Sequence, residues 1–218
     1  MIELSKTTYA IGDIHGYHNK LEALIERIQP TRYDTLVFLG DYIDRGPDSR
    51  KVVDYLIELS AKTSCVFLCG NHEELLLDYL ATGRHEDLWL ENGGQAMVDN
   101  YISGRLSPQK LKDAMPASHL KFFDNLRYYY EDEAYIYVHA GLLPGLPLEQ
   151  QKPEVLCWIR NDFFQHATKR SKKVIFGHTH FALPLVSQDK IGIDTGAAYG
   201  GPLTAVKLPH EMFIMADG

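Results

Sequence analysis

The chain has 218 residues, 45% of them hydrophobic, and its 22 basic and 29 acidic residues give a formal net charge of -7. This length predicts a single domain over 1–218, and the negative charge argues against nucleic acid or an anionic membrane as the main partner. The sequence shows neither the pattern of a signal peptide nor an apolar run of membrane-spanning length. We therefore expect a cytoplasmic protein.

Short apolar runs rich in β-branched and aromatic residues recur along the chain, each followed by a polar loop. Between the first three runs lie helical patterns of apolar residues, at 21–28 and 52–57. This alternation of strands and helices predicts an α/β fold, in which ligands bind beyond the carboxyl ends of the strands. The predicted buried strands are 7–11, 35–39, 64–69, 134–138 and 173–176.

The alternation stops between residues 75 and about 130, where helix-like segments separated by glycine and proline predict a helical insertion. The run 128–130 that follows is typical of a strand edge. Near the end of the chain, three short strand-like segments predict a second, more antiparallel sheet packed on the first. These segments are 190–194, 204–208 and 211–216.

Three cysteines are present, an odd number without the spacing of a zinc site. A disulfide framework is therefore not expected, and Cys65, Cys69 and Cys157 are predicted to be buried thiols.

Polar side chains follow the predicted strands. Asp13 and His15 come directly after the first strand, one residue apart, so that in extended backbone both project to the same side. Asp41 and Asn71 follow the second and third strands, each after a glycine. Each residue also has an ordinary interpretation, because Asp and His are common in turns and Asn71 suits a helix N-cap.

Two histidines complete this set, because His139 and His178 follow the fourth and fifth strands. Together the set supplies carboxylate, imidazole and amide ligands without a thiolate. Such ligands suit Mn, Fe or Zn better than Cu(I) or an iron–sulfur cluster. The pattern predicts a metal site.

The motifs GDIHG, GDYIDRG, GNHE and HAG, at 12–16, 40–46, 70–73 and 139–141, resemble signatures of the phosphoprotein phosphatase family. These serine/threonine phosphatases, with small bacterial and phage lambda-type members, belong to the calcineurin-like metallophosphoesterase superfamily. The resemblance spans residues 8 to about 206. It implies a four-layer α/β/β/α sandwich.

The resemblance also implies two divalent metal ions, Mn first, with Fe or Zn as alternatives. A hydroxide bridging them would attack phosphorus directly, without a phosphoenzyme. Motif by motif, the ligand assignment is Asp13 and His15 to one ion, Asn71, His139 and His178 to the other, and Asp41 to both.

Four further residues resemble groups that handle the proton and the phosphate. His72 matches the general acid, with Asp44 orienting its ring, and Arg45 matches a phosphate-binding arginine. Arg160 resembles a second phosphate-binding arginine, although its surroundings match less closely. The alternatives are a histidine at a helix terminus for His72, a surface ion pair for Arg45 and helix solvation for Arg160. His180 stays open between a further metal ligand and a packed side chain.

For the substrate, the resemblance favours phosphoserine or phosphothreonine in proteins, with some phosphotyrosine activity. The alternative is a symmetrical diadenosine tetraphosphate hydrolase, because those enzymes share GDxHG, HAG and a segment similar to 193–206. They tend to carry alanine where Asp44 stands and GNHD in place of GNHE, and both differences favour the protein phosphatase. The third hypothesis is a silent module, meaning a protein that keeps the fold and binds a phosphorylated partner but has no catalytic activity. All predicted ligands are present, which speaks against it.

Overall fold

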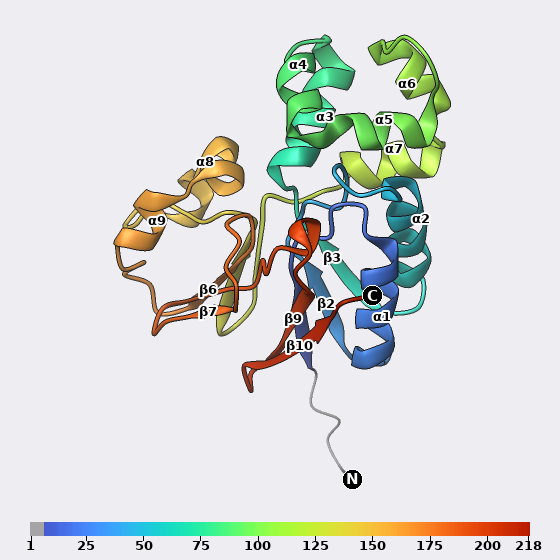
Figure 1. Ribbon diagram of the computed structural model, residues 1–218. Helices are drawn as coiled ribbons and strands as arrows, with labels where there is room; N and C mark the ends of the chain where they lie inside the picture. Colours follow the sequence, from blue (N-terminus) through green and yellow to red (C-terminus); the bar gives the residue numbers. More distant parts are fainter. Residues whose placement is uncertain (1–6) are drawn as a thin grey trace.

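The computed structural model describes residues 7–218 and contains two five-stranded sheets (Figure 1). In the first sheet the strand order is β10-β9-β1-β2-β3. The three strands predicted from the first part of the chain, β1, β2 and β3, are parallel. Strand β9 is antiparallel to β1, and β10 is antiparallel to β9. The bounds are β1 (Thr8–Ile11), β2 (Thr35–Phe38), β3 (Ser64–Phe67), β9 (Leu203–Leu208) and β10 (Met212–Ala216).

The second sheet has the order β4-β5-β6-β8-β7, with three parallel strands in the middle and an antiparallel strand at each edge. Its bounds are β4 (Tyr129–Glu131), β5 (Tyr135–Val138), β6 (Lys173–Phe176), β7 (Leu185–Val186) and β8 (Lys190–Gly192). The tyrosine run at 128–130 thus belongs to an edge strand, as predicted.

Helices cover the outer faces of both sheets (Figure 1). Helices α1 (His18–Ile28) and α2 (Ser49–Ser60) pack on the first sheet, and α8 (Pro153–Trp158) and α9 (Asn161–Gln165) lie beside the second. A separate apolar core joins the inner faces of the sheets, with contributions from both. The predicted four-layer α/β/β/α sandwich is therefore confirmed.

The helical insertion lies above the carboxyl ends of the first sheet's parallel strands (Figure 1). It begins at Asn71, a few residues before the predicted start. Its helices are α3 (Asn71–Thr82), α4 (Glu86–Trp89), α5 (Gln95–Tyr101), α6 (Pro108–Ala114) and α7 (Ala117–Asp124). The buried His119 ties it to α2, because its ring bonds Asp54 Oδ1 and Tyr101 Oη, each at 2.7 Å.

The prediction for the last two strands was wrong. Segments 204–208 and 211–216 form β9 and β10 of the first sheet, and of the three late segments only 190–192 joins the second. Strand β9 pairs with β1 and covers the edge that β1 would otherwise expose. The sequence did not predict this pairing, because an alternating apolar pattern indicates a strand but not the strand it pairs with. Within residues 7–218, no helix is long and apolar enough to cross a bilayer.

The three cysteines are free thiols. Cys69 and Cys157 are buried, as predicted, whereas Cys65 is only half-buried. The prediction failed for Cys65 because β3 is the edge strand of its sheet, so that helices and neighbouring strands cover it less completely.

Candidate metal centre

The predicted site residues lie on loops that follow β1, β2, β3, β5 and β6. Several of them adopt a left-handed backbone conformation, with a positive φ that is rare outside glycine. Strain of this kind costs about 1–3 kcal/mol per residue and persists where the surrounding structure enforces it. The residues are His15, Asp41, Asp44, Arg45 and His178, with φ between 49° and 70°.

The carboxylate of Asp41 lies at the centre of this region, between two groups of imidazoles. Its Oδ2 lies 3.4 Å from His15 Nε2 and 4.0 Å from His72 Nε2. Its Oδ1 lies 3.5 Å from His139 Nε2, and His178 belongs to the same side. In each group the ligand atoms lie within 4.8 Å of one another, and all five residues are buried. One carboxylate thus serves two groups that could each hold a cation.

Asn71 lies on the His139 side. Its Oδ1 is 3.0 Å from His139 Nε2 and 2.8 Å from His178 Nδ1. The alternative role of Asn71 as a helix cap does not hold, because Gly70 occupies the N-cap position of α3 and Asn71 is the first helical residue. The amide oxygen is therefore directed to the imidazoles.

Backbone carbonyls orient two of the histidines. Nδ1 of His15 bonds the carbonyl of Ile43 at 3.0 Å, and Nδ1 of His139 bonds the carbonyl of Leu39 at 2.9 Å. In each ring the proton then resides on Nδ1, which leaves the Nε2 lone pair facing Asp41. Hydrogen bonds of this kind fix the tautomer of metal-binding histidines.

Burial also keeps these imidazoles uncharged. It lowers the pKa of His15 and of His139, and it lowers the pKa of His178 to about 3. Metal ions bind the neutral form of histidine, so a site of neutral imidazoles around an ionised carboxylate fits divalent cations.

Asp13 is placed differently from the other predicted ligands. Its two carboxylate oxygens accept hydrogen bonds from the backbone N–H of His178, at 3.0 and 3.2 Å. Burial, then the charges of Asp194 and Asp41, raise the pKa of Asp13. In residues 7–218, the group around His15 contains His72 and not Asp13, so the assignment of Asp13 as a ligand stays a prediction.

Asp194 was not singled out from the sequence. It is buried close to Asp13 and Asp41, and burial raises its pKa. Three carboxylates buried together repel one another, and divalent cations are the charges that would offset this repulsion. The sequence did contain one indication of this role. Asp194 follows the strand-like segment KIGI, just as Asp13 and Asp41 follow predicted strands.

His72 forms a buried pair with Asp44. Its Nδ1 donates to Asp44 Oδ2 at 2.7 Å, and the same oxygen accepts a hydrogen bond from Trp89 Nε1 at 3.0 Å. Burial lowers the pKa of His72, but the charges of Asp41 and Asp44 outweigh this effect and raise it. Trp89 is fully buried in α4, so the helical insertion helps to hold the pair.

The guanidinium of Arg45 faces both His15 and His72. Nη1 donates to His15 Nε2 at 2.8 Å, and Nη2 donates to His72 Nε2 at 3.0 Å. Within the described chain, Arg45 makes no ion pair with Asp44 or Asp48, which removes the alternative of a surface pair. A group with two parallel N–H donors directed into the site suits a phosphate.

The insertion also positions Arg45. Its backbone N–H donates to the carbonyl of Gly93 at 3.0 Å, and its Nε donates to the carbonyl of Asn92 at 3.4 Å. Gly93 has a φ of 103°, and a Cβ there would lie 2.7 Å from Arg45 Cγ. Only glycine fits this turn.

The two remaining predicted residues lie at the rim. Arg160 is exposed, and its Nη1 lies 3.4 Å from the carbonyl of His178 and 3.3 Å from Thr179 Oγ1. His180 is also exposed and packs on Tyr199, with ring centroids 4.8 Å apart. Among residues 7–218, His180 is in neither group of candidate metal ligands, which favours a packed side chain over a further metal ligand.

Glu73 is a second buried residue of the site for which the motifs predicted no role. It is fully buried and accepts three backbone hydrogen bonds, from Asp41 and Gly70 on Oε2 and from Tyr42 on Oε1, at 2.8–3.0 Å. It therefore joins the loop after β2 to the start of α3. The available signal was a glutamate three residues after the N-cap, a spacing typical of a capping box.

Replacing Glu73 by alanine is expected to lower the free energy of unfolding by at least about 3 kcal/mol, because three buried N–H groups would lose their acceptor. The measurement is urea denaturation. Glu74→Ala is the matched control, since this half-buried neighbour accepts one hydrogen bond, from Trp158 Nε1, and should cost about 1 kcal/mol. Equal losses in the two variants would contradict the role of Glu73.

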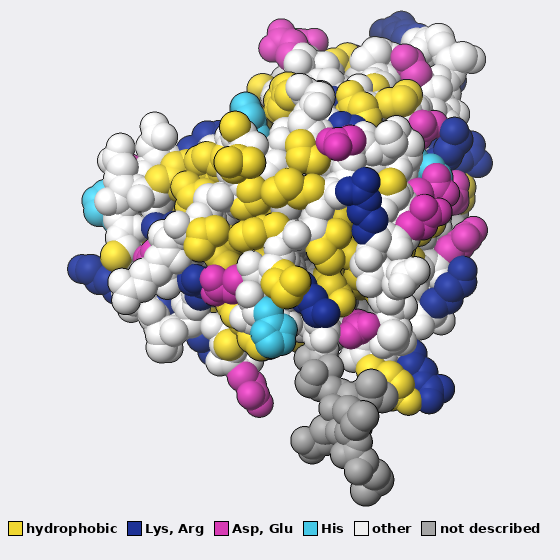
Figure 2. All heavy atoms as spheres, turned by 60° about the horizontal axis from the view of Figure 1, so that its bottom comes forward, with side chains coloured by type: hydrophobic (Ala, Val, Ile, Leu, Met, Phe, Trp, Pro, Cys, Tyr) yellow, Lys and Arg dark blue, Asp and Glu magenta, His cyan; other side chains and the backbone are white. Residues whose placement is uncertain are grey.

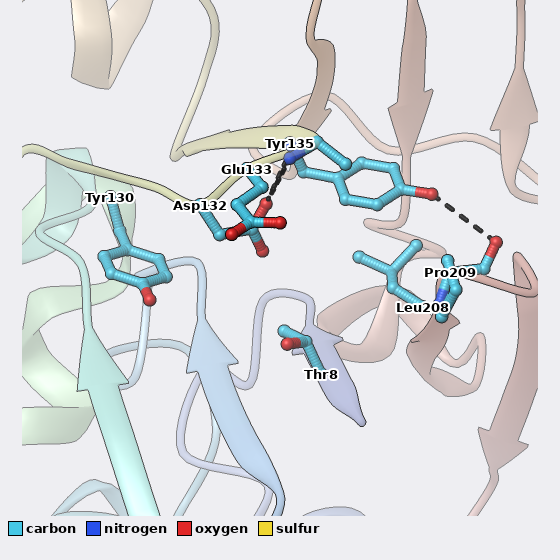
Figure 3. Close-up of a pocket in the computed structure, with 8 residues that line it drawn as sticks. Thr8, Tyr130, Asp132, Glu133, Tyr135, Leu208 and Pro209 are labelled. Carbon is cyan, nitrogen blue, oxygen red and sulfur yellow. Dashed lines mark hydrogen bonds between the residues drawn. The ribbon is translucent and has the colours of Figure 1, made fainter. Parts of the chain in front are cut away.

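A pocket of about 410 Å³ lies at the opposite end of the strands, where β1 and β5 begin and β9 ends (Figure 3). Two hydrogen bonds lie in its wall, since Tyr135 N–H donates to Asp132 Oδ1 and Tyr135 Oη–H donates to the carbonyl of Pro209. None of the predicted site residues lines this pocket of β1, β5 and β9.

Hydrophobic side chains gather across the middle of the molecular surface when the lower end of Figure 1 is turned forward (Figure 2).

The family model for calcineurin-like phosphoesterases matches residues 6–199, so the chain belongs to this family and is a metal-dependent phosphoesterase. Among its relatives, the asymmetrical bis(5'-nucleosyl)-tetraphosphatase PrpE of Anoxybacillus flavithermus is 27% identical over 92% of this chain and 89% of that protein. The symmetrical bis(5'-nucleosyl)-tetraphosphatase of Nitrosomonas europaea is 32% identical over 79% of this chain and 60% of that protein.

A similar fold occurs in a crystal structure described provisionally as a diadenosine tetraphosphatase. The TM-score is 0.74 at 24% identity, covering 99% of this chain and 95% of that one. The superfamily inferred from the motifs is thus confirmed. The narrower prediction of a phosphoprotein phosphatase is not, because these relatives carry the names of tetraphosphatases.

Proposed function

We propose that the protein hydrolyses bis(5'-nucleosyl) tetraphosphates. The observation that carries this proposal is the similarity to PrpE over nearly the full length of both chains. Two motif differences, at Asp44 and at the end of GNHE, favoured a protein phosphatase over a symmetrical tetraphosphatase. They do not count against an asymmetrical enzyme, which is what this relative is named. A tetraphosphate hydrolase, which the motifs offered as a symmetrical enzyme and as the alternative, therefore becomes the first candidate. Because this relative is named asymmetrical, we expect cleavage away from the middle of the phosphate chain instead.

The proposed roles follow the geometry around Asp41. His15, Asn71, His139 and His178 would hold two divalent cations on either side of this shared carboxylate, with Asp13 as a further ligand. When bound, such ions lower the pKa of water and offset the charge of a phosphate. The protein fixes the positions of the ligands in advance, because the loops that carry them are tied by buried hydrogen bonds.

His72 is proposed to donate a proton to the departing oxygen through Nε2, which requires that a bound phosphate first takes the Arg45 N–H that Nε2 accepts in the structure. Its Nδ1–H is occupied by Asp44, which orients the ring and favours its protonated form. A departing phosphate chain is a much weaker base than an alkoxide, so it needs this proton less. The contribution of His72 should therefore depend on the leaving group.

Arg45 is proposed to bind the phosphate under attack, with Arg160 at the rim as a second contact. Replacing Arg45 by lysine keeps the charge but loses the two parallel donors. We expect kcat/KM to fall by roughly 10- to 100-fold, as the loss of a hydrogen bond to a charged group predicts. Steady-state kinetics measures the effect, with the exposed Arg32→Lys as control. A variant as active as the unaltered enzyme would contradict the assignment.

The substrate is tested by an assay, run separately with Mn²⁺, Fe²⁺ and Zn²⁺, that compares diadenosine tetraphosphate, a phosphoserine peptide and an aryl phosphate. We expect the largest kcat/KM for the dinucleotide, with adenosine mono- and triphosphate as products. Two molecules of adenosine diphosphate would show symmetrical cleavage. A larger kcat/KM for the phosphopeptide would overturn the substrate proposal, and inactivity with every metal would support the silent module.

A protein phosphatase is the second candidate. The buried pair of His72 and Asp44, 2.7 Å apart, favours it, because a protonated acid is most useful when the leaving group is the alkoxide of serine or threonine. The same assay decides between the two candidates.

A further inference from the structure

An exposed aromatic side chain stands at the edge of the candidate metal centre. The side chain of Tyr199 is 61% exposed, although it is one of the large hydrophobic residues of the chain. The ring of His180 packs on it with an interplanar angle of 37°. The guanidinium carbon of Arg45 lies 5.3 Å from the centroid of the Tyr199 ring.

We propose that Tyr199, backed by His180, is a platform on which one nucleobase of the substrate stacks while Arg45 binds the phosphate chain. This inference rests on the proposed function and adds a site for the nucleoside. The ligand class is a nucleoside 5'-phosphate with two or more phosphates.

The position of Tyr199 follows from its contact with Arg45. The guanidinium donates to His15 and His72 and therefore faces the interior of the site. The same guanidinium contacts the Tyr199 ring, so this ring borders the space beside the phosphate-binding donors. A phosphate group bound by Arg45 would therefore have the exposed ring beside it.

Backbone and Lys20 hydrogen bonds hold the loop that carries Tyr199. Ala197–Tyr199 forms a single helical turn, in which Tyr199 N–H donates to the carbonyl of Gly196 at 2.8 Å. Lys20 of α1 is 7% exposed, and its ammonium donates to the carbonyls of Ala197 at 3.1 Å and Gly201 at 2.7 Å. Because the loop is already ordered, a base that stacks on it has a smaller entropic cost of binding.

The chemistry of the platform matches a base better than a peptide side chain. Each nucleobase has a π-face, and a base stacked on an aromatic side chain gains about 1–3 kcal/mol. Such stacking does not read the identity of the base. We therefore expect the platform to accept different nucleosides, with purines favoured by their larger ring area.

The test measures how much the nucleoside adds to binding. Binding of adenosine diphosphate and of pyrophosphate to the enzyme in the presence of Mn²⁺ is compared by isothermal titration calorimetry. The ratio of their dissociation constants, Kd for pyrophosphate over Kd for adenosine diphosphate, isolates the contribution of the nucleoside. Tyr199→Ala is expected to lower this ratio roughly 5- to 100-fold, the loss that corresponds to one stacked base.

Two variants serve as controls. Tyr199→Phe keeps the ring and should keep the ratio of the unaltered enzyme. Tyr33→Ala removes another exposed tyrosine that lies beside an arginine, Arg32, and should also leave the ratio unchanged. An unchanged ratio in Tyr199→Ala would overturn the platform.

The platform and the proposed function fail separately. If the unaltered enzyme prefers a phosphopeptide to diadenosine tetraphosphate, the proposed function is wrong. The ratio of dissociation constants still measures stacking, because it requires turnover of neither substrate. If the dinucleotide is preferred and the ratio does not respond to Tyr199→Ala, the proposed function holds and the platform is wrong.

Discussion

Replacing Asp41 by asparagine is expected to remove the pair of metal ions and to lower kcat/KM by roughly 10^3-fold or more, since metal ions supply several kcal/mol of transition-state stabilisation. Among residues 7–218, Asp41 is the residue that both groups of candidate ligands share. A neutral amide offers one oxygen in place of two and cannot balance two cations. Elemental analysis of the purified protein gives the number of ions per chain.

The matched control for Asp41 is Asp99→Asn, an exposed residue on α5. It should retain the metal content and activity of the unaltered enzyme. Far-UV circular dichroism of both variants checks that the fold is kept. Two ions per chain in Asp41→Asn would refute the bridging role of this carboxylate.

Replacing His72 by asparagine is expected to lower kcat by roughly 10^2- to 10^4-fold on an alkyl phosphate, because proton donation to a poor leaving group is lost. The loss on diadenosine tetraphosphate should be smaller, since the departing phosphate chain needs less protonation. Metal content should not change. Kinetics with both substrates and elemental analysis measure these effects.

The metal content also separates two roles that the structure brings close together. Nε2 of His72 lies in one group with His15 and Asp41, at 4.0 Å from the Asp41 carboxylate. Loss of one ion in His72→Asn would show that His72 is a ligand. Equal losses of activity on good and poor leaving groups would also count against a proton donor.

Most of the fold could be predicted because its strands and helices have strong local patterns. The apolar runs before Asp13, Asp41 and Asn71 are short, rich in β-branched and aromatic residues, and end in glycine turns. These features depend only on neighbouring residues. The pairing of β9 and β10 with the first sheet could not be predicted, because a short strand carries no signal for its partner. The single-domain organisation stays a prediction.

The candidate site was predictable to a similar extent. The motifs supplied the types and the spacing of the predicted ligands, because each motif lies within one loop. They did not reveal Glu73 or Asp194, whose roles depend on contacts with other loops. They also placed Asp13 with His15, whereas the structure gathers His72 with His15 and Asp41.

The sequence by itself thus determined which side chains are available for metal and phosphate chemistry, and at which strand ends they stand. Only the tertiary structure decided how they are combined. Trp89 reaches Asp44 from the insertion, and Tyr199 reaches Arg45 from the other end of the chain. Contacts of this kind join residues far apart in sequence, and they arise from the packing of whole elements, which no local pattern of residues encodes.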